Sequence, residues 1–138
     1  MGPKAKRTNA DRRQASSHLA KAEQFLRASE RSAGESDHDA AMLNAIHSAI
    51  SAADAVTVAL AGVRSTDPDH QRVADLLREV AGASGEIRGQ VTQLRRLLAR
   101  KNLVEYESRR ARAAEASDAL KRASRFVAWA RGVIAASK

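Results

Sequence analysis

The chain of 138 residues has no cysteine, only two prolines and only four aromatic side chains. Without cysteine there is no disulfide, no thiol chemistry and no cysteine-bound zinc, which excludes zinc-finger nucleic-acid binding and fits a reducing compartment. The few aromatics stand against thirty alanines. Alanine loses least on entering a helix, whereas strands favour aromatic and β-branched residues, so an all-β fold is excluded.

Long apolar runs are also missing. No stretch approaches the roughly 18 apolar residues of a membrane span. The N-terminal sequence MGPKAKRTNADRR has no hydrophobic signal core. We therefore expect a cytoplasmic protein that does not interact with a membrane.

Charge is abundant but unevenly distributed. The net charge of +8 comes from 24 Lys and Arg against 16 Asp and Glu. Residues 1–13 carry five cations and one acid, residues 34–70 six acids and one cation, and residues 95–112 seven cations and two acids. A basic excess makes acidic partners plausible, nucleic acid first. Eighteen of the cations are arginine, whose planar fork grips phosphate, although a GC-rich genome produces the same excess.

Helical periodicity divides the chain into five segments. We expect helices over 11–32 and 39–63, a third that begins at Pro68 and weakens at residues 82–85, a fourth that runs to about 108, and a last one over 112–136. Short connections between them imply an all-α antiparallel bundle of four to five helices. Residues 1–10 are expected to form a disordered basic tail, and residues 11–138 a single domain.

Apolar stripes mark the faces that these helices bury. The clearest stripe runs along the second helix through Met42, Ile46, Ala49, Ala53, Val56, Leu60 and Val63. In the last helix Ala116, Leu120, Ala123, Val127, Ala130 and Ile134 form one stripe, with Phe126, Trp129 and Val133 beside it. Such alanine-rich faces allow close helix approach and favour a homodimer.

The common catalytic motifs are absent. The sequence has no phosphate-binding glycine loop, GxGxxG, HExxH or GxSxG pattern. His38 and His70 stand at helix starts beside aspartates, where they are read as exposed, so neither a metal site nor a cofactor is expected. His47 and Asp54 lie seven residues apart on one helix face. They form either a polar pocket facing a partner or ligand, or a core histidine and an unrelated boundary aspartate.

A polar cluster occupies the fourth helix. Helical spacing places Asn102, Glu105, Tyr106 and Arg109 on one face, which Arg95 and Lys101 approach from upstream. Asparagine and tyrosine are poor choices for a plain solvated helix face. The cluster is either a binding surface or a surface ion-pair ladder in which Tyr106 caps the core.

Three segments resemble small HEPN proteins over residues 40 to about 134: AMLNAIHSAISAADAVTVALAGVRSTDPDH, LLARKNLVEY and AAEASDALKRASRFVAWA. The resemblance implies a bundle of four or five helices that is typically a dimer. Many members are metal-independent ribonucleases of toxin–antitoxin, abortive-infection and CRISPR systems, and others are non-catalytic binding modules. Their catalytic pattern is Arg, four to six residues, then His, often with Asn after the Arg, and two copies form one composite site.

This chain departs from that pattern. Counting five residues on from Arg100, or four from the Lys101-Asn102 pair, leads to Tyr106 rather than to histidine. Free histidine titrates near ~6.5 and tyrosine near ~10, so Tyr106 is a poor proton-transfer group at neutral pH. The motif is therefore read as degenerate. Tyr106 can still stack on a base, and the cations can still bind phosphate.

Three functions remain open. The first is a homodimer that binds RNA, a nucleotide or a partner protein such as a nucleotidyltransferase or antitoxin, without efficient ribonuclease activity. Its binding residues are Arg96, Arg100, Lys101, Asn102, Tyr106 and Arg109. The second is an active metal-independent ribonuclease toxin in which His47 completes the site. The third is a structural or adaptor bundle whose basic strip only keeps the protein in solution.

Overall fold

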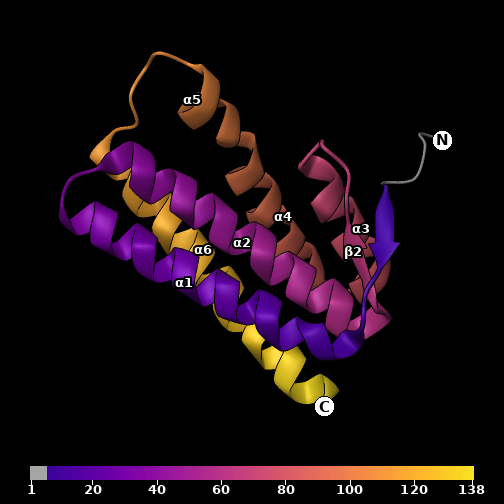
Figure 1. The fold of residues 1–138 in the computed structure, drawn as a ribbon. Helices are drawn as coiled ribbons and strands as arrows, with labels where there is room; N and C mark the ends of the chain where they lie inside the picture. Colours follow the sequence, from indigo (N-terminus) through magenta and orange to yellow (C-terminus); the bar gives the residue numbers. More distant parts are fainter. Residues whose placement is uncertain (1–5) are drawn as a thin grey trace.

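The computed structural model describes residues 6–138, and helices dominate it (Figure 1). The helices are α1 (Ala15–Gly34), α2 (His38–Ala61), α3 (Gln71–Ala81), α4 (Gly85–Ala99), the six-residue α5 (Lys101–Tyr106) and α6 (Ala113–Ser137), with a 3-10 turn at Arg12–Gln14. Two short strands, β1 (Arg7–Asn9) and β2 (Val63–Ser65), accompany them. The predicted all-α helical bundle is confirmed.

Helix α2 is the centre of the bundle. It packs most extensively on α1 and α6, and it also contacts α3, α4 and α5. Its inner positions are mainly small, which lets neighbouring helices approach closely: Ala41, Ala45, Ala49, Ala52, Ala53 and Ala55 are all buried. Helix α2 is long and apolar enough to cross a membrane, but the core helix of a bundle passes the same test. In this structure 61% of its most apolar stretch is buried inside the bundle.

Larger side chains fill the space around these alanines. Met42 and Ile46 of the predicted stripe are fully buried, and so are Leu77, Leu94 and Phe126 from three other helices. Phe126 was expected beside the stripe of the last helix, yet it lies inside the core. Trp129 is only partly buried, and its ring lies 5.5 Å from that of Phe126.

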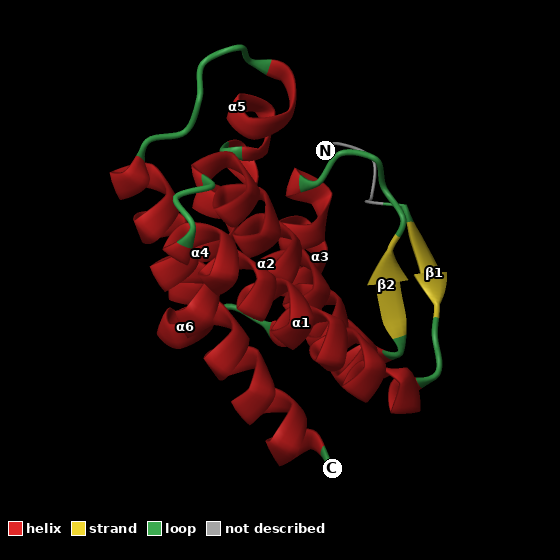
Figure 2. Cartoon of the chain, turned by 60° about the vertical axis from the view of Figure 1, so that its left-hand side comes forward, coloured by secondary structure: helices red, strands yellow, loops and turns green. Residues whose placement is uncertain are grey.

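The N-terminal segment is not a disordered tail over its whole predicted length. Residues 7–9 form β1, which pairs antiparallel with β2 so that Thr8 lies opposite Arg64 (Figure 2). Gly62, with φ of 63°, ends α2 in a left-handed cap that few other residues adopt. Helix α2 therefore stops at Ala61 rather than at the predicted Val63, and the chain leaves as a strand. Residues 1–5 of the predicted tail lie outside the described residues.

Other helix boundaries also differ from prediction, beginning with α1, which starts at Ala15 after a 3-10 turn rather than at residue 11. Helix α3 begins at Gln71 rather than Pro68, because the Asp69 carboxylate accepts the Gln71 amide at 3.0 Å and holds the preceding residues in a turn. The predicted fourth helix is broken at Arg100 into α4 and α5 and ends at Tyr106 instead of about 108. Residues 107–112 then lead to α6, anchored where the Ala111 amide donates to Asp39 at 2.7 Å.

Candidate functional site

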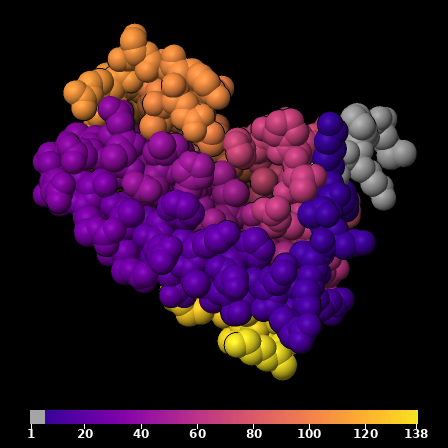
Figure 3. All heavy atoms as spheres, viewed as in Figure 1, coloured from indigo at the N-terminus to yellow at the C-terminus, as the bar shows by residue number. Residues whose placement is uncertain are grey.

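The break between α4 and α5 creates one wall of a cleft of about 270 Å³. The other wall is the turn that precedes α3, and Figure 3 shows the surface hollowed between the orange α5 segment and the pink segment that leads into α3. The lining is mostly polar: Pro68, Asp69, His70, Gln71, Leu98, Ala99, Lys101, Asn102, Glu105 and Tyr106. Three of the predicted binding residues, Lys101, Asn102 and Tyr106, are thus brought together.

An ion pair lines the α5 wall. The Lys101 Nζ lies 2.5 Å from Glu105 Oε1, one helical turn away, and the Lys101 side chain is only 13% exposed. This hydrogen bond lowers the pKa of the Glu105 carboxyl below its ordinary value. Tyr106, the next residue, is 78% exposed, the largest exposure of any big apolar side chain among residues 6–138. The wall therefore combines a held cation with a freely accessible aromatic ring.

The charges of this ion pair act on two histidines from different elements, His47 on α2 and His70 in the cleft lining. Burial lowers the pKa of His47, the positive charges of Lys101 and His70 lower it further, and the Glu105 carboxylate opposes them. Burial and the Lys101 charge likewise lower the pKa of His70, against the opposing carboxylates of Glu105 and Asp69. Both imidazoles are consequently neutral at pH 7, able to accept a proton or to hydrogen-bond.

His70 is the residue that sequence analysis missed. It was read as an exposed residue at a helix start, and it instead lines the cleft. The signal that could have found it is the Asp67-Pro68-Asp69 sequence before it, a turn that points its next residue away from the helix stripe. Helix α5 lies opposite that turn only because the helix breaks at Arg100, and the sequence did not reveal this break.

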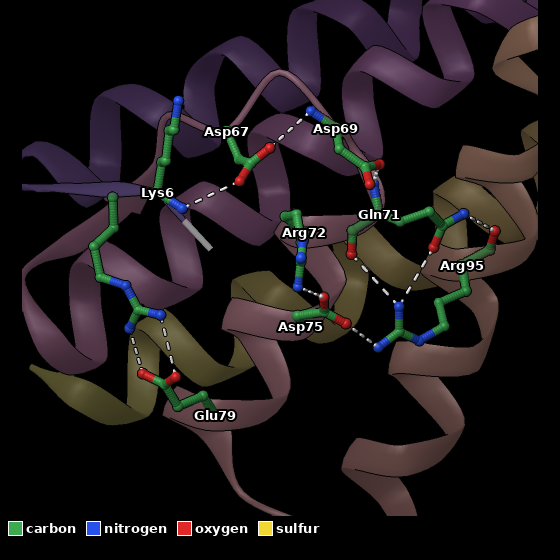
Figure 4. A network of polar contacts seen from close by, with 9 residues as sticks. Lys6, Asp67, Asp69, Gln71, Arg72, Asp75, Glu79 and Arg95 are labelled. Carbon is green, nitrogen blue, oxygen red and sulfur yellow. Dashed lines mark hydrogen bonds and ion pairs between the residues drawn. The ribbon is translucent and has the colours of Figure 1, made fainter. Parts of the chain in front are cut away.

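The turn that carries His70 is held by a network of polar contacts (Figure 4). The Asp67 carboxylate accepts the backbone amides of Lys6 at 3.2 Å and Asp69 at 2.9 Å. The side-chain amide of Gln71 donates to the backbone carbonyl of Arg95 at 3.2 Å, and Arg95 Nη2 lies 2.6 Å from the Asp75 carboxylate. Strand β1 is tied to α3 by an ion pair between Arg7 and Glu79. These contacts fix the position of His70 relative to α4 and hence to α5.

The other predicted binding residues lie elsewhere. Arg100 turns toward α6, where its Nη2 is 2.6 Å from Asp118. Arg109 pairs with Glu115 at 3.0 Å in the loop before α6. Arg96 is exposed on α4 and forms no ion pair within residues 6–138. None of the three lines the cleft, so Lys101 is the one Lys or Arg among residues 6–138 that does.

His47 and Asp54 were proposed as one polar pocket, but their surroundings differ. His47 lies toward α5 and its ring packs 5.6 Å from the ring of Phe25 on α1. Asp54 is buried on α2, and burial raises its pKa to about 7 against the attraction of Arg64 and Lys21. Two turns of helix separate them along α2. Neither of them lines the cleft, but the charges of Lys101 and Glu105 act on His47.

Comparison with known families agrees with the fold. The model of the HEPN domain family matches residues 15–133, from the start of α1 to near the end of α6. We found no match among curated proteins. The family match confirms the resemblance drawn from residues 40 to about 134 and extends it to the first helix.

Proposed function

The chain belongs to the HEPN domain family, and we propose that it binds RNA or a nucleotide in the cleft between α5 and the turn before α3. The observation that carries the proposal is the meeting of Lys101, Asn102 and Tyr106 with His70 around one polar cleft, with His47 close to the same ion pair. An ion-pair ladder capping the core would bury the tyrosine ring, whereas Tyr106 is 78% exposed.

Each lining residue suits one part of a nucleotide. The Tyr106 ring offers a stacking surface for a base, a contact that contributes about 1–3 kcal/mol in single-stranded nucleic-acid complexes. The Asn102 amide has both donors and an acceptor for a base edge. Lys101 has three N–H donors and uses one for Glu105. It can therefore bind a phosphate oxygen without giving up its partner.

The proposal includes a homodimer in the cytoplasm and a role in a toxin–antitoxin or defence system, with a nucleotidyltransferase or antitoxin as a possible partner. Membership of the HEPN family supports the dimer, because catalytic members of the family build a composite site from two copies. In such a dimer the two α5 segments would lie close together. Light scattering tests this, and a monomer at high concentration would contradict the shared cleft.

We do not include efficient RNA cleavage in the proposal. Metal-free cleavage needs one group to take the proton of the 2′-hydroxyl and another to give a proton to the 5′ leaving oxygen. Tyr106 occupies the motif position of histidine. Burial lowers the pKa of both nearby imidazoles, so at pH 7 they can accept protons but rarely carry one to donate.

A metal-independent ribonuclease is the second candidate, and the placement of His47 and His70 around Lys101 favours it. One imidazole could act as the base, the other as the acid, and the ammonium group could stabilise charge on the phosphate in the transition state. Because the acid must be protonated, such cleavage should be faster at mildly acidic pH than at pH 8.

The experiment that separates these functions uses structured RNA in EDTA from pH 5.5 to 8. We expect salt-dependent binding without rapid cleavage. Lys101→Gln should lower the slope of log K against log salt by about 0.7, the contribution of one phosphate contact on a single strand. Arg88→Gln removes the same charge from an exposed position at the far end of α4 and should leave binding nearly unchanged.

Three results would change the conclusion. Rapid cleavage in EDTA that disappears in both His47→Ala and His70→Ala would establish the ribonuclease. Binding that is equally strong in Lys101→Gln and Arg88→Gln would contradict the cleft as the binding site. A complete lack of salt-dependent RNA binding would favour the structural adaptor.

A further inference from the structure

A second hollow lies on the other side of His47, between α1 and α2. Its volume is about 430 Å³, and its lining is Gln24, Phe25, Arg27, Ala28, Arg31 and Asn44. The lining contains two arginines and two amide side chains but no carboxylate. The α5 cleft, by contrast, contains both Asp69 and Glu105. We refer to this second hollow as the arginine groove.

The two cations of the arginine groove are available to a ligand. Arg27 and Arg31 are exposed, stand one helical turn apart on α1, and form no ion pair within residues 6–138. Of the acids on the same helix, Glu23 pairs with Arg131 at 3.3 Å, and Glu30 lines a different groove, with Lys121 and Arg125. Most arginines of the basic 95–112 segment are instead neutralised by partners.

A contact between two tilted rings lies between the arginine groove and the residues of the α5 cleft. Phe25 lines the groove, and its ring lies 5.6 Å from that of His47. The charges of Lys101 and Glu105 in turn shift the pKa of His47 in opposite directions. Asn44 of the groove and His47 are three residues apart on α2, about one helical turn. Figure 1 shows α2 running between α1 and α5, so a ligand that occupied both sites would have to cross α2.

We propose that the arginine groove binds the phosphate backbone of an RNA strand of which another nucleotide occupies the α5 cleft. This inference rests on the proposed function and narrows it to a polymeric ligand rather than a free nucleotide. Planar guanidinium groups bind phosphate oxygens in a bidentate way, and Gln24 and Asn44 add amide donors. The Asn44 amide already donates to the Ala40 carbonyl at 2.9 Å, which holds its side chain against α2 with one N–H left over.

The test compares a labelled single-stranded RNA of about ten nucleotides with a dinucleotide. In the double variant Arg27→Gln/Arg31→Gln, we expect the affinity for the longer RNA to fall at least tenfold and its salt slope to drop by about 1.4, two single-strand phosphates. Dinucleotide binding in the α5 cleft should not change. The matched control is Lys121→Gln/Arg125→Gln, which removes the same charge from exposed positions on α6 and should change both affinities less than twofold.

The outcomes distinguish the two proposals. If the longer RNA binds the arginine variant and the control equally well, while Tyr106→Ala still weakens both ligands, the arginine groove is not part of the site and the cleft stands. If the arginine variant weakens the dinucleotide as much as the longer RNA, the groove does not act as a separate backbone site and the inference fails. If the unmodified protein binds neither ligand, the proposed function and this inference fail together.

Discussion

The two faces of α2 differ in what they contact. Toward α1 and α6 the helix presents alanines, Met42 and Ile46, which are fully buried among apolar neighbours. Toward α5 it presents His47, half-buried beside an ion pair and a polar cleft. The first face holds the bundle together through close packing, and the second leaves polar groups where a ligand can reach them. Stability and binding should therefore respond to different substitutions.

The largest loss of stability should come from Phe126→Ala, because Phe126 of α6 belongs to the apolar core that α2 packs against. Phe126 is fully buried, and truncating such a ring costs about 3–5 kcal/mol, from lost burial and the cavity left behind. Urea unfolding measures the change. Trp129→Ala is the matched test, because Trp129 packs on the same ring but is partly exposed. Equal losses for the two variants would place Trp129 in the core after all.

Asp54 is an acid among the buried residues of α2, and it makes stability depend on pH. Its pKa is raised to about 7 in the folded protein, against about 3.9 unfolded. Between these values the folded state binds more protons, so stability falls as pH rises from about 4 through 7. Asp54→Asn removes this dependence. Its stability relative to the unmodified protein should increase by about 2–4 kcal/mol from pH 4 to pH 8 in urea unfolding. A constant difference would show that Asp54 is ionised in the fold.

Tyr106→Ala tests the polar cleft next to α5. Tyr106 contributes little to packing at 78% exposure, so unfolding in urea should be unchanged. The loss of base stacking should weaken RNA binding by about 1–3 kcal/mol, measured by fluorescence anisotropy. Tyr106→Phe keeps the ring and should bind nearly as well as the unmodified protein. If Phe binds as weakly as Ala, the hydroxyl rather than the ring makes the contact.

The smallest effect is expected for Arg100→Gln, which tests whether Arg100 contributes to RNA binding or only to the contact with α6. Arg100 pairs with Asp118 across to α6, with side chains 28% and 42% exposed. A pair this exposed contributes about 0.5 kcal/mol, so unfolding should shift only slightly. RNA affinity and its salt slope should stay the same, in contrast to Lys101→Gln. A salt slope that falls as much as for Lys101→Gln would return Arg100 to the binding site, as the sequence first indicated.

Local patterns predicted the helices well where a whole stripe supported them. Met42, Ile46 and Ala49 repeat at helical spacing and are buried as expected. The ends of helices were less predictable, because they depend on single contacts. The helix end at Gly62 depends on a left-handed backbone, and the start of β1 depends on a partner strand more than fifty residues away. Periodicity alone contains neither kind of information.

The binding residues divide in the same way. Lys101, Asn102 and Tyr106 were predicted as a group because helical spacing places them together, and they do line one cleft. Arg100 was grouped with them on charge, but the attraction of Asp118 draws it to the opposite side. His70 comes from a separate turn thirty residues earlier, and it was overlooked because its distance from α5 in the fold cannot be read from its neighbours in sequence.

Composition and periodicity by themselves determined that this protein is a helical bundle with an alanine-rich core, and short motifs identified the HEPN family. Both properties depend on residues close together in the chain, whose preferences add up along each helix. The tertiary structure alone decided that α4 breaks before Lys101 and that the same ion pair acts on His47 and His70. It also decided that Arg27 and Arg31 beside Phe25 form no ion pair with the residues that the structure describes. These features depend on which distant side chains meet, because long-range packing and ion pairing choose among local alternatives of nearly equal energy.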